Sequence, residues 1–193
     1  MSDPDVVELA PRLYRLRIPG GAAHLLNCYL WLDDTGVTLV DTGWPDSANV
    51  IADALTALGR RRHDVERIVL THFHEDHMGT ATDKAPMSRA GAYRLSGLTY
   101  LGESFRIGVM LDRGWPEYNY PAPLESGTVK NYRAFLKWQA ENNGMKVERF
   151  VPGRKDQIVL RRDASGRYTG ATQGHDCASE LRGAAYATSS VSL

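Results

Sequence analysis

Three of the six histidines in this chain fall within six consecutive residues, and an aspartate lies among them. Segment 71–79 reads Thr-His-Phe-His-Glu-Asp-His-Met-Gly, which places ligand-type side chains at His72, His74, Asp76 and His77. Imidazole nitrogens and carboxylate oxygens are the ligands that a borderline cation such as Zn²⁺ takes. A surface or core role would explain any one of these residues, but four in this spacing would be poorly compensated without a cation. The spacing therefore predicts a metal site.

This histidine-rich segment directly follows a short apolar strand. Residues 67–71 include three successive apolar side chains, as expected of an interior strand that is covered on both faces. The chain that leaves such a strand forms a loop at the edge of the sheet. There the first two histidines can project together, and a turn can bring Asp76 and His77 round to face them.

The residues before that strand predict a meander of strands and then a helix. Pro and Gly residues at 19–21 and turn residues at 33–36 separate the strands. The helix has Asp46 or Ser47 as its N-cap and Gly59 directly after its end. Strand, helix and strand in succession imply α/β layering. The predicted elements are strands 13–18, 24–32 and 37–41 and a helix that ends at Leu58.

A second carboxylate, Asp41, ends the last strand of that meander. The carboxyl end of a strand faces the crevice where α/β sheets bind their ligands. Asp41 is therefore placed to accept a hydrogen bond from the far nitrogen of a ligand histidine or from loop amides, and so to hold the ligands in position. The alternative is a carboxylate that caps its own turn, and the two roles are compatible.

At this point the sequence resembles a known family. The pattern of residues 72–77, followed by Gly79, is similar to the HxHxDH signature of the metallo-β-lactamase-fold hydrolases, and residues 39–43, Leu-Val-Asp-Thr-Gly, resemble a strand-end element of the same family. The resemblance covers residues 7–80 and implies an αββα sandwich. It also implies that His72 and His74 bind one metal ion, that Asp76 and His77 bind a second, and that a metal-bound hydroxide attacks a carbonyl or phosphoryl centre. Asp76 would also orient that hydroxide, which makes it the predicted catalytic residue.

The family uses a further histidine within a Gly-His dipeptide, and Gly174 with His175 is the candidate here. Strands predicted at 146–151, 157–161 and 167–171 would lead into it. His175 is accordingly predicted as a metal ligand, with an ordinary loop histidine as the alternative. Only 18 residues follow His175 and none is a histidine. We therefore expect the C-terminal half of the sandwich and the second metal site to be incomplete, in a fragment or in a shortened relative that a partner subunit completes.

We expect one domain over residues 1–193, in which 80–145 is an insertion or lid segment. Repeated Gly and Pro residues interrupt any period between 80 and 127, whereas 129–143 has the apolar spacing of a helix followed by Gly144. The aromatic and turn-rich residues 113–121 suit a lid over an apolar substrate, or equally a packed core edge or dimer contact.

The amino-acid composition limits the classes of function that we expect of this chain. Lys plus Arg and Asp plus Glu both number 23, so the net charge is zero and nucleic acid is not an expected partner. The basic run Arg60 to His63 reads as a solvated turn. Two cysteines do not make a disulfide framework, and no apolar stretch approaches the roughly 20 residues that span a bilayer. We expect a soluble, cytoplasmic protein with a small-molecule substrate, no membrane partner and a possible homo-oligomeric state.

Together these observations predict a hydrolase that uses one or two Zn²⁺ ions, or other divalent metals, to activate water toward an ester, thioester, lactone or related carbonyl. The alternative function is a non-catalytic or partner-completed metal-binding subunit of such a hydrolase.

Overall fold

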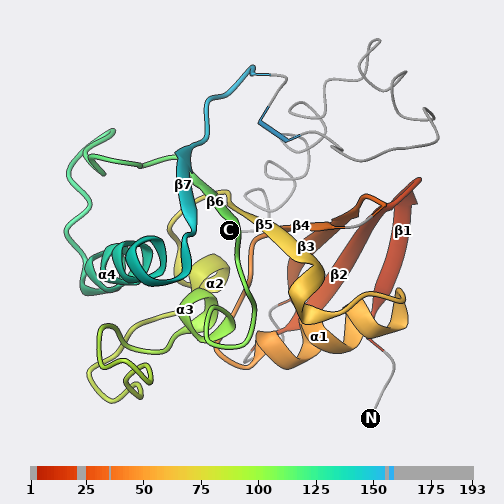
Figure 1. The fold of residues 1–193 in the computed structure, drawn as a ribbon, viewed down its shortest axis with the longest axis horizontal. Helices are drawn as coiled ribbons and strands as arrows, with labels where there is room; N and C mark the ends of the chain where they lie inside the picture. The colour runs from red at the N-terminus through yellow and green to blue at the C-terminus, as the bar shows by residue number, and fades with distance from the viewer. Residues whose placement is uncertain (1–3, 21–24, 35, 155–156, 159–193) are drawn as a thin grey trace.

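A computed structural model gives the fold of the chain, and it describes residues 4–20, 25–34, 36–154 and 157–158 (Figure 1). These residues form a seven-stranded sheet with helices. The strands are β1 Val6–Ala10, β2 Leu13–Pro19, β3 Leu25–Leu32, β4 Val37–Val40, β5 Val65–Leu70, β6 Val109–Asp112 and β7 Lys146–Arg149. The α-helices are α1 Ser47–Ala57, α2 Glu75–Met78, α3 Gly97–Leu101 and α4 Gly127–Asn143, and a 3₁₀ turn spans Arg62–Asp64.

The sheet is mixed, and its strand order follows the chain from β1 to β7. Strands β1 to β4 pair antiparallel as a meander, whereas β4, β5, β6 and β7 pair in parallel. The parallel strands need crossover connections, which helices α1, α3 and α4 supply. As a result, the carboxyl ends of β4, β5 and β6 lie at one edge of the sheet.

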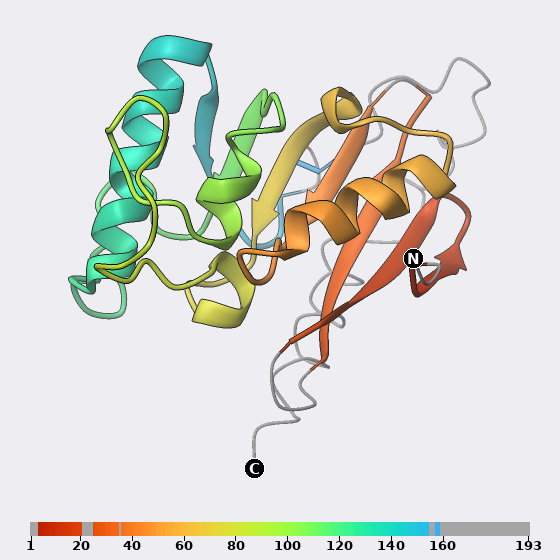
Figure 2. The same ribbon diagram turned by 90° about the horizontal axis from the view of Figure 1, so that it is seen from below.

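One face of the sheet carries the main apolar core. Leu39, Ile68 and Met110 from three neighbouring parallel strands pack there with α1, α3 and α4. Figures 1 and 2 show these helices along that side, with α1 crossing in front of the strands in Figure 2. The other face carries a smaller apolar cluster that includes Val40 and Val69. Side chains of successive strand residues therefore alternate between two apolar environments, which accounts for the unbroken apolar run in β5.

Most of the elements predicted before the histidine-rich segment are confirmed. The three meander strands correspond to β2, β3 and β4, and the predicted helix is α1, with Asp46 as its N-cap and Gly59 at a φ of 69° just after its end. The predicted α/β class is confirmed by the mixed sheet and its helices. Strand β1 was not predicted from the sequence; among the described strands it lies at the outer edge of the meander and pairs with β2 alone.

The predictions for residues after the histidine-rich segment are confirmed in part. The predicted helix 129–143 is confirmed as α4, in which Ser126 Oγ accepts a hydrogen bond from Val129 N at 3.2 Å and Gly144 takes the left-handed conformation. The predicted strand 146–151 is the shorter β7. Of the two further strands, 167–171 lies outside the described residues, and the described part of 157–161 is a bend rather than a strand.

Segment 80–145, expected to be an insertion or lid, contains strand β6, which lies between β5 and β7 in the sheet. That part of the segment therefore belongs to the sheet layer, and α4 from the same segment packs on the core. The role of residues 113–121 as a lid stays a prediction. Within the described part of the chain, no helix combines the length and apolar character needed to cross a bilayer.

Candidate metal centre

The candidate site lies where two parallel strands end side by side. Asp41 follows β4, Thr71 and His72 follow β5, and Val40 is paired with Val69 across the two strands. Asp41 N donates to Val69 O at 2.9 Å, which continues the ladder one residue beyond β4. The parallel pairing therefore brings a residue from before helix α1 against a residue that comes 30 positions later. The histidine-rich loop begins at this junction.

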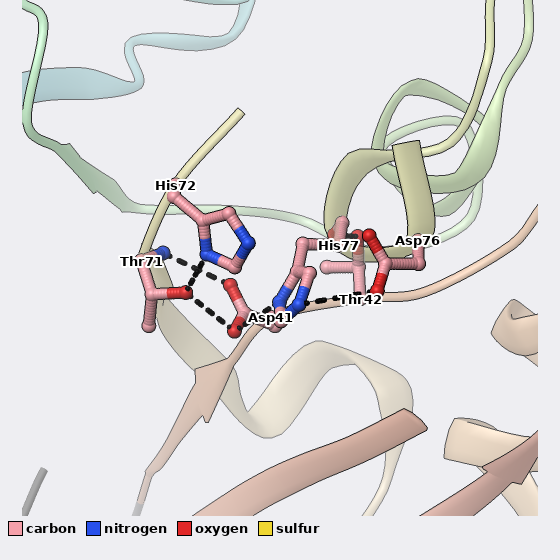
Figure 3. Close-up of polar contacts among 6 residues, drawn as sticks. All are labelled: Asp41, Thr42, Thr71, His72, Asp76 and His77. Carbon is pink, nitrogen blue, oxygen red and sulfur yellow. Dashed lines mark hydrogen bonds and ion pairs between the residues drawn. The ribbon is translucent and has the colours of Figure 1, made fainter. Parts of the chain in front are cut away.

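Three of the four predicted ligands in that loop come together. His72, Asp76 and His77 each offer one ligand atom, and these atoms all lie within 4.8 Å of one another. Tetrahedral zinc with bonds of about 2.1 Å separates its ligand atoms by roughly 3.4 Å. His77 Nε2 and Asp76 Oδ2 are 3.5 Å apart, close to that separation. The three side chains thus form one candidate cation site (Figure 3).

His74 lies outside this group of three. It is exposed and occupies the N-cap of the short helix α2, where its carbonyl accepts hydrogen bonds from His77 N at 3.0 Å and Met78 N at 3.2 Å. Its ring packs edge-on against the ring of His72, with 4.6 Å between the centroids. The division of the motif into one ion on His72 and His74 and another on Asp76 and His77 stays a prediction.

Asp41 lies behind the ligands and has three hydrogen-bond donors around it. Its Oδ1 accepts from Thr71 N at 2.9 Å, and its Oδ2 accepts from Thr71 Oγ1 at 2.7 Å and lies 2.7 Å from His77 Nδ1 (Figure 3). The carboxylate is only 3% exposed, and its own backbone has a φ of 58°. The contact with His77 is the one anticipated for a residue that holds a ligand histidine, and the contacts with Thr71 are those of a loop anchor.

The surroundings shift the pKa values of the two histidines in opposite directions. Burial lowers the pKa of His72 to about 4, and the nearby His77 contributes in the same direction. Burial also acts to lower the pKa of His77, but the hydrogen bond and charge of Asp41 and the charge of Asp76 outweigh it, so that pKa is raised. The surroundings therefore disfavour the charged form of His72 and favour the charged form of His77.

Close backbone approaches fix the loop next to its neighbours. A Cβ atom on Gly79, whose φ is 80°, would meet Gly97 N at 2.0 Å, and one on Gly97 would meet Gly43 O at 1.9 Å. His77 O accepts from Thr42 N at 3.2 Å and from Gly43 N at 3.3 Å. Only glycine fits at residues 79 and 97, and this packing holds the end of α2 against the turn after β4.

Sequence reasoning missed a buried carboxylate at the same edge of the sheet. Asp112, the last residue of β6, is fully buried. Its Oδ1 accepts from Gly114 N at 2.7 Å and Trp115 N at 2.8 Å, and its Oδ2 accepts from the hydroxyls of Tyr118 at 2.7 Å and Tyr132 at 2.8 Å. An acidic residue at the end of an apolar run was the available signal, as it was for Asp41.

Asp112 and its two tyrosine donors, together called the Asp112 cluster, contact residues 71–79 through Phe73. Residues 71–79, which include the short helix α2, are called the metal loop below. The Phe73 ring centroid lies 5.7 Å from that of Tyr118 and 6.0 Å from that of Tyr132, and the Arg113 guanidinium lies 5.1 Å from the Phe73 centroid. Phe73 is the residue between the first two histidines of the motif. The aromatic cluster therefore packs against the side chain of the residue that directly follows His72. The remaining predicted ligand, His175, lies outside the described residues.

Comparison with known proteins agrees with this picture. Residues 23–84, which span β3 to the end of the histidine-rich loop, match the family model of the metallo-beta-lactamase superfamily. This stretch includes both the strand-end element and the histidine-rich segment, so the resemblance drawn from the motif is confirmed. The uncharacterized protein YobT of Bacillus subtilis (strain 168) is 40% identical over 55 residues, which are 28% of this chain and 22% of YobT.

Two solved structures illustrate how partial the likeness is. The metallo-beta-lactamase family protein TTHA1429 of Thermus thermophilus is 35% identical, over 37% of this chain and 25% of that one, with a TM-score of 0.34. MEM-A1, a subclass B3 metallo-beta-lactamase from a soil metagenome library, is 21% identical, over 74% of this chain and 44% of that one, with a TM-score of 0.43. The chain thus spans less than half the length of each relative.

Proposed function

We propose that this chain is the metal-binding part of a hydrolase in which His72, Asp76 and His77 hold a zinc ion. The convergence of their three ligand atoms carries the proposal. Two imidazoles and one carboxylate are a ligand set found in catalytic zinc sites, whereas structural sites are built mainly from cysteine and histidine. Zinc in such a site supplies Lewis acidity and lowers the pKa of water toward neutrality.

The candidate ligands differ in solvent exposure, so one side of the site is buried and the other is accessible to solvent. The His77 side chain is 4% exposed and that of Asp76 is 46% exposed. Solvent and substrate therefore reach the site from the side of Asp76, while His77 is held against Asp41 in the interior. Asp76 is placed to accept a hydrogen bond from a water molecule and to keep its proton away from the bond to be cleaved. A small substrate with an ester, thioester or lactone carbonyl suits this arrangement.

Metal content per chain, measured after purification and after incubation with zinc, tests the proposal directly. His72→Ala removes a ligand from a loop and is expected to lower bound zinc well below that of the unsubstituted chain, with an unchanged circular dichroism spectrum. His63→Ala is the matched control, because the His63 side chain is 60% exposed and outside the site. A chain that takes up no zinc, or a His72→Ala variant that keeps stoichiometric zinc, would contradict the proposal.

A second candidate function is a metal-binding subunit that a partner completes. It is favoured by the fact that, among the described residues, the candidate ligand group consists of three side chains from one short segment, residues 72–77. Hydrolysis of chromogenic ester, thioester and lactone substrates separates the two candidates. Activity that is proportional to the concentration of a monomeric preparation supports the hydrolase, whereas zinc binding without turnover, or activity that rises steeply with chain concentration, supports the subunit.

A further inference from the structure

Thr71 directly precedes the first histidine of the motif and contacts both a buried carboxylate and a candidate ligand. Its Oγ1 lies 2.7 Å from Asp41 Oδ2 and 2.9 Å from His72 Nδ1 (Figure 3). Its backbone N donates to the other carboxylate oxygen at 2.9 Å. The side chain of Thr71 therefore bridges Asp41, at the end of β4, and His72, at the start of the metal loop.

The number of hydrogens available at this bridge fixes where each one lies. An ionised carboxylate only accepts hydrogen bonds, and a threonine hydroxyl has one hydrogen to give. If that hydrogen goes to Asp41 Oδ2, Thr71 Oγ1 can offer His72 only a lone pair. His72 Nδ1 must then carry a hydrogen and donate it, which leaves the lone pair of the neutral ring on Nε2. These hydrogen positions follow from the network of heavy atoms.

The carboxylate of Asp41 contacts the other candidate ligand histidine, His77, directly. His77 Nδ1 donates to Asp41 Oδ2 across 2.7 Å, so the nitrogen left for a metal ion is again Nε2. The rings of His72 and His77 are neighbours, with 3.8 Å between their centroids and 52° between their planes. One buried carboxylate thus sets the tautomers of two neighbouring rings, directly for His77 and through a hydroxyl group for His72.

We propose that Thr71 is a positioning residue whose hydroxyl relays the charge of Asp41 to His72 and holds that ring with Nε2 bare toward the metal position. This inference rests on the proposed metal site, and it assigns to Thr71 a role that the ligands do not have. Hydrogen-bonding partners of ligand histidines fix the ring orientation and tautomer, and their loss costs about 10–100-fold in metal affinity.

Thr71→Val is the discriminating substitution, because valine keeps the branched shape and the backbone N–H to Asp41 while removing Oγ1. Thr71→Ser is the matched control that restores the hydroxyl. We expect Thr71→Val to weaken zinc binding by about 10–100-fold in a competition titration with a chromophoric chelator, and Thr71→Ser to stay within about threefold of the unsubstituted chain. Equal affinities for the valine and serine variants would overturn the proposal.

A measurement on the chain without metal distinguishes failure of the Thr71 relay from failure of the proposed zinc site. Two-bond ¹H–¹⁵N spectra of the metal-free chain, at a pH where His72 is neutral, show which ring nitrogen carries the hydrogen. We expect Nδ1–H on His72 in the unsubstituted chain and in Thr71→Ser, and a shift toward Nε2–H in Thr71→Val, with exposed His63 unchanged in all three. Nε2–H on His72 in the unsubstituted chain would overturn the relay even if Thr71→Val does not fold. Failure of the unsubstituted chain to bind zinc, with Nδ1–H observed, would instead overturn the proposed function and leave the relay supported.

Discussion

Replacing Asp41 with asparagine removes one charge from the site and almost no volume. The asparagine oxygen can still accept from Thr71 N, but its amide group then presents hydrogens where Oδ2 accepted from Thr71 Oγ1 and His77 Nδ1. His77 can meet an N–H donor only by moving its own hydrogen from Nδ1 to Nε2. Asp41→Asn is therefore expected to place a hydrogen on the nitrogen that would bind the metal.

The expected magnitudes follow from the three hydrogen bonds that lose a charged acceptor. Bonds to a charged group contribute about 1.5–3 kcal/mol and neutral ones about 0.5–1.5 kcal/mol, so the three replacements cost about 3 kcal/mol of unfolding free energy. For a chain of this size that corresponds to a fall of about 6–12 °C in Tm. Loss of the partner of a ligand histidine costs about 10–100-fold in metal affinity.

Two measurements on the same preparations check this expectation. Chelator competition gives the zinc affinity, and thermal unfolding of the metal-free chain gives Tm. Asp53→Asn is the control, because Asp53 lies exposed on α1 and the substitution removes the same charge far from Asp41's contacts. If Asp41→Asn lowers Tm but binds zinc within threefold of the unsubstituted chain, Asp41 only caps the turn after β4, and the argument from histidine tautomers is refuted.

Three further outcomes are expected. Asp112→Asn should lower the unfolding free energy by about 2–4 kcal/mol in denaturant titrations, because the tyrosine hydroxyls lose charged acceptors; a change below about 0.5 kcal/mol would contradict this. His74→Ala should weaken zinc binding by less than tenfold, and less than His72→Ala does, since His74 lies outside the group of ligand atoms. In pH titrations of the metal-free chain by NMR, His72 should titrate with a pKa of about 4. The unfolded chain takes up that proton near pH 6.5, so the contribution of His72 to stability declines as pH falls from about 6.5 toward 4. The raised pKa of His77 acts in the opposite sense: it stabilises the fold below about pH 6.5, and that contribution is lost as pH rises through the folded pKa.

The part of the site that sequence could predict is the part encoded by local spacing and strand order. His72, Asp76 and His77 lie within six consecutive residues, and a segment this short can bring its side chains toward one point. Asp41 is distant in sequence, yet it was predictable because β4, α1 and β5 form one parallel crossover that aligns both strand ends. Crossovers between neighbouring parallel strands are almost always right-handed, which leaves little freedom in where the second strand lies.

The unpredicted parts depend on tertiary contacts that leave a weak local pattern. Strand β6 has four residues among many Gly and Pro residues, and it forms because β5 and β7 supply its hydrogen-bond partners on both sides. The separation of His74 from the other ligands likewise arises from helix α2, which begins directly after it. A pattern of ligand types at fixed spacing does not encode where a four-residue helix starts.

The metal loop is held from both sides by carboxylates at the ends of the strands that flank β5. On one side Asp41 binds Thr71 and His77 through polar contacts, and on the other side Asp112 orders the tyrosines against which Phe73 packs. Successive residues of an extended segment point in opposite directions, so fixing Phe73 toward the aromatic cluster turns His72 away from it. Both anchors are buried, whereas the side chain of the candidate ligand Asp76 is 46% exposed. The sheet therefore anchors the segment from two sides, which favours a fixed arrangement in which the candidate ligand atoms of His72, Asp76 and His77 lie within 4.8 Å of one another.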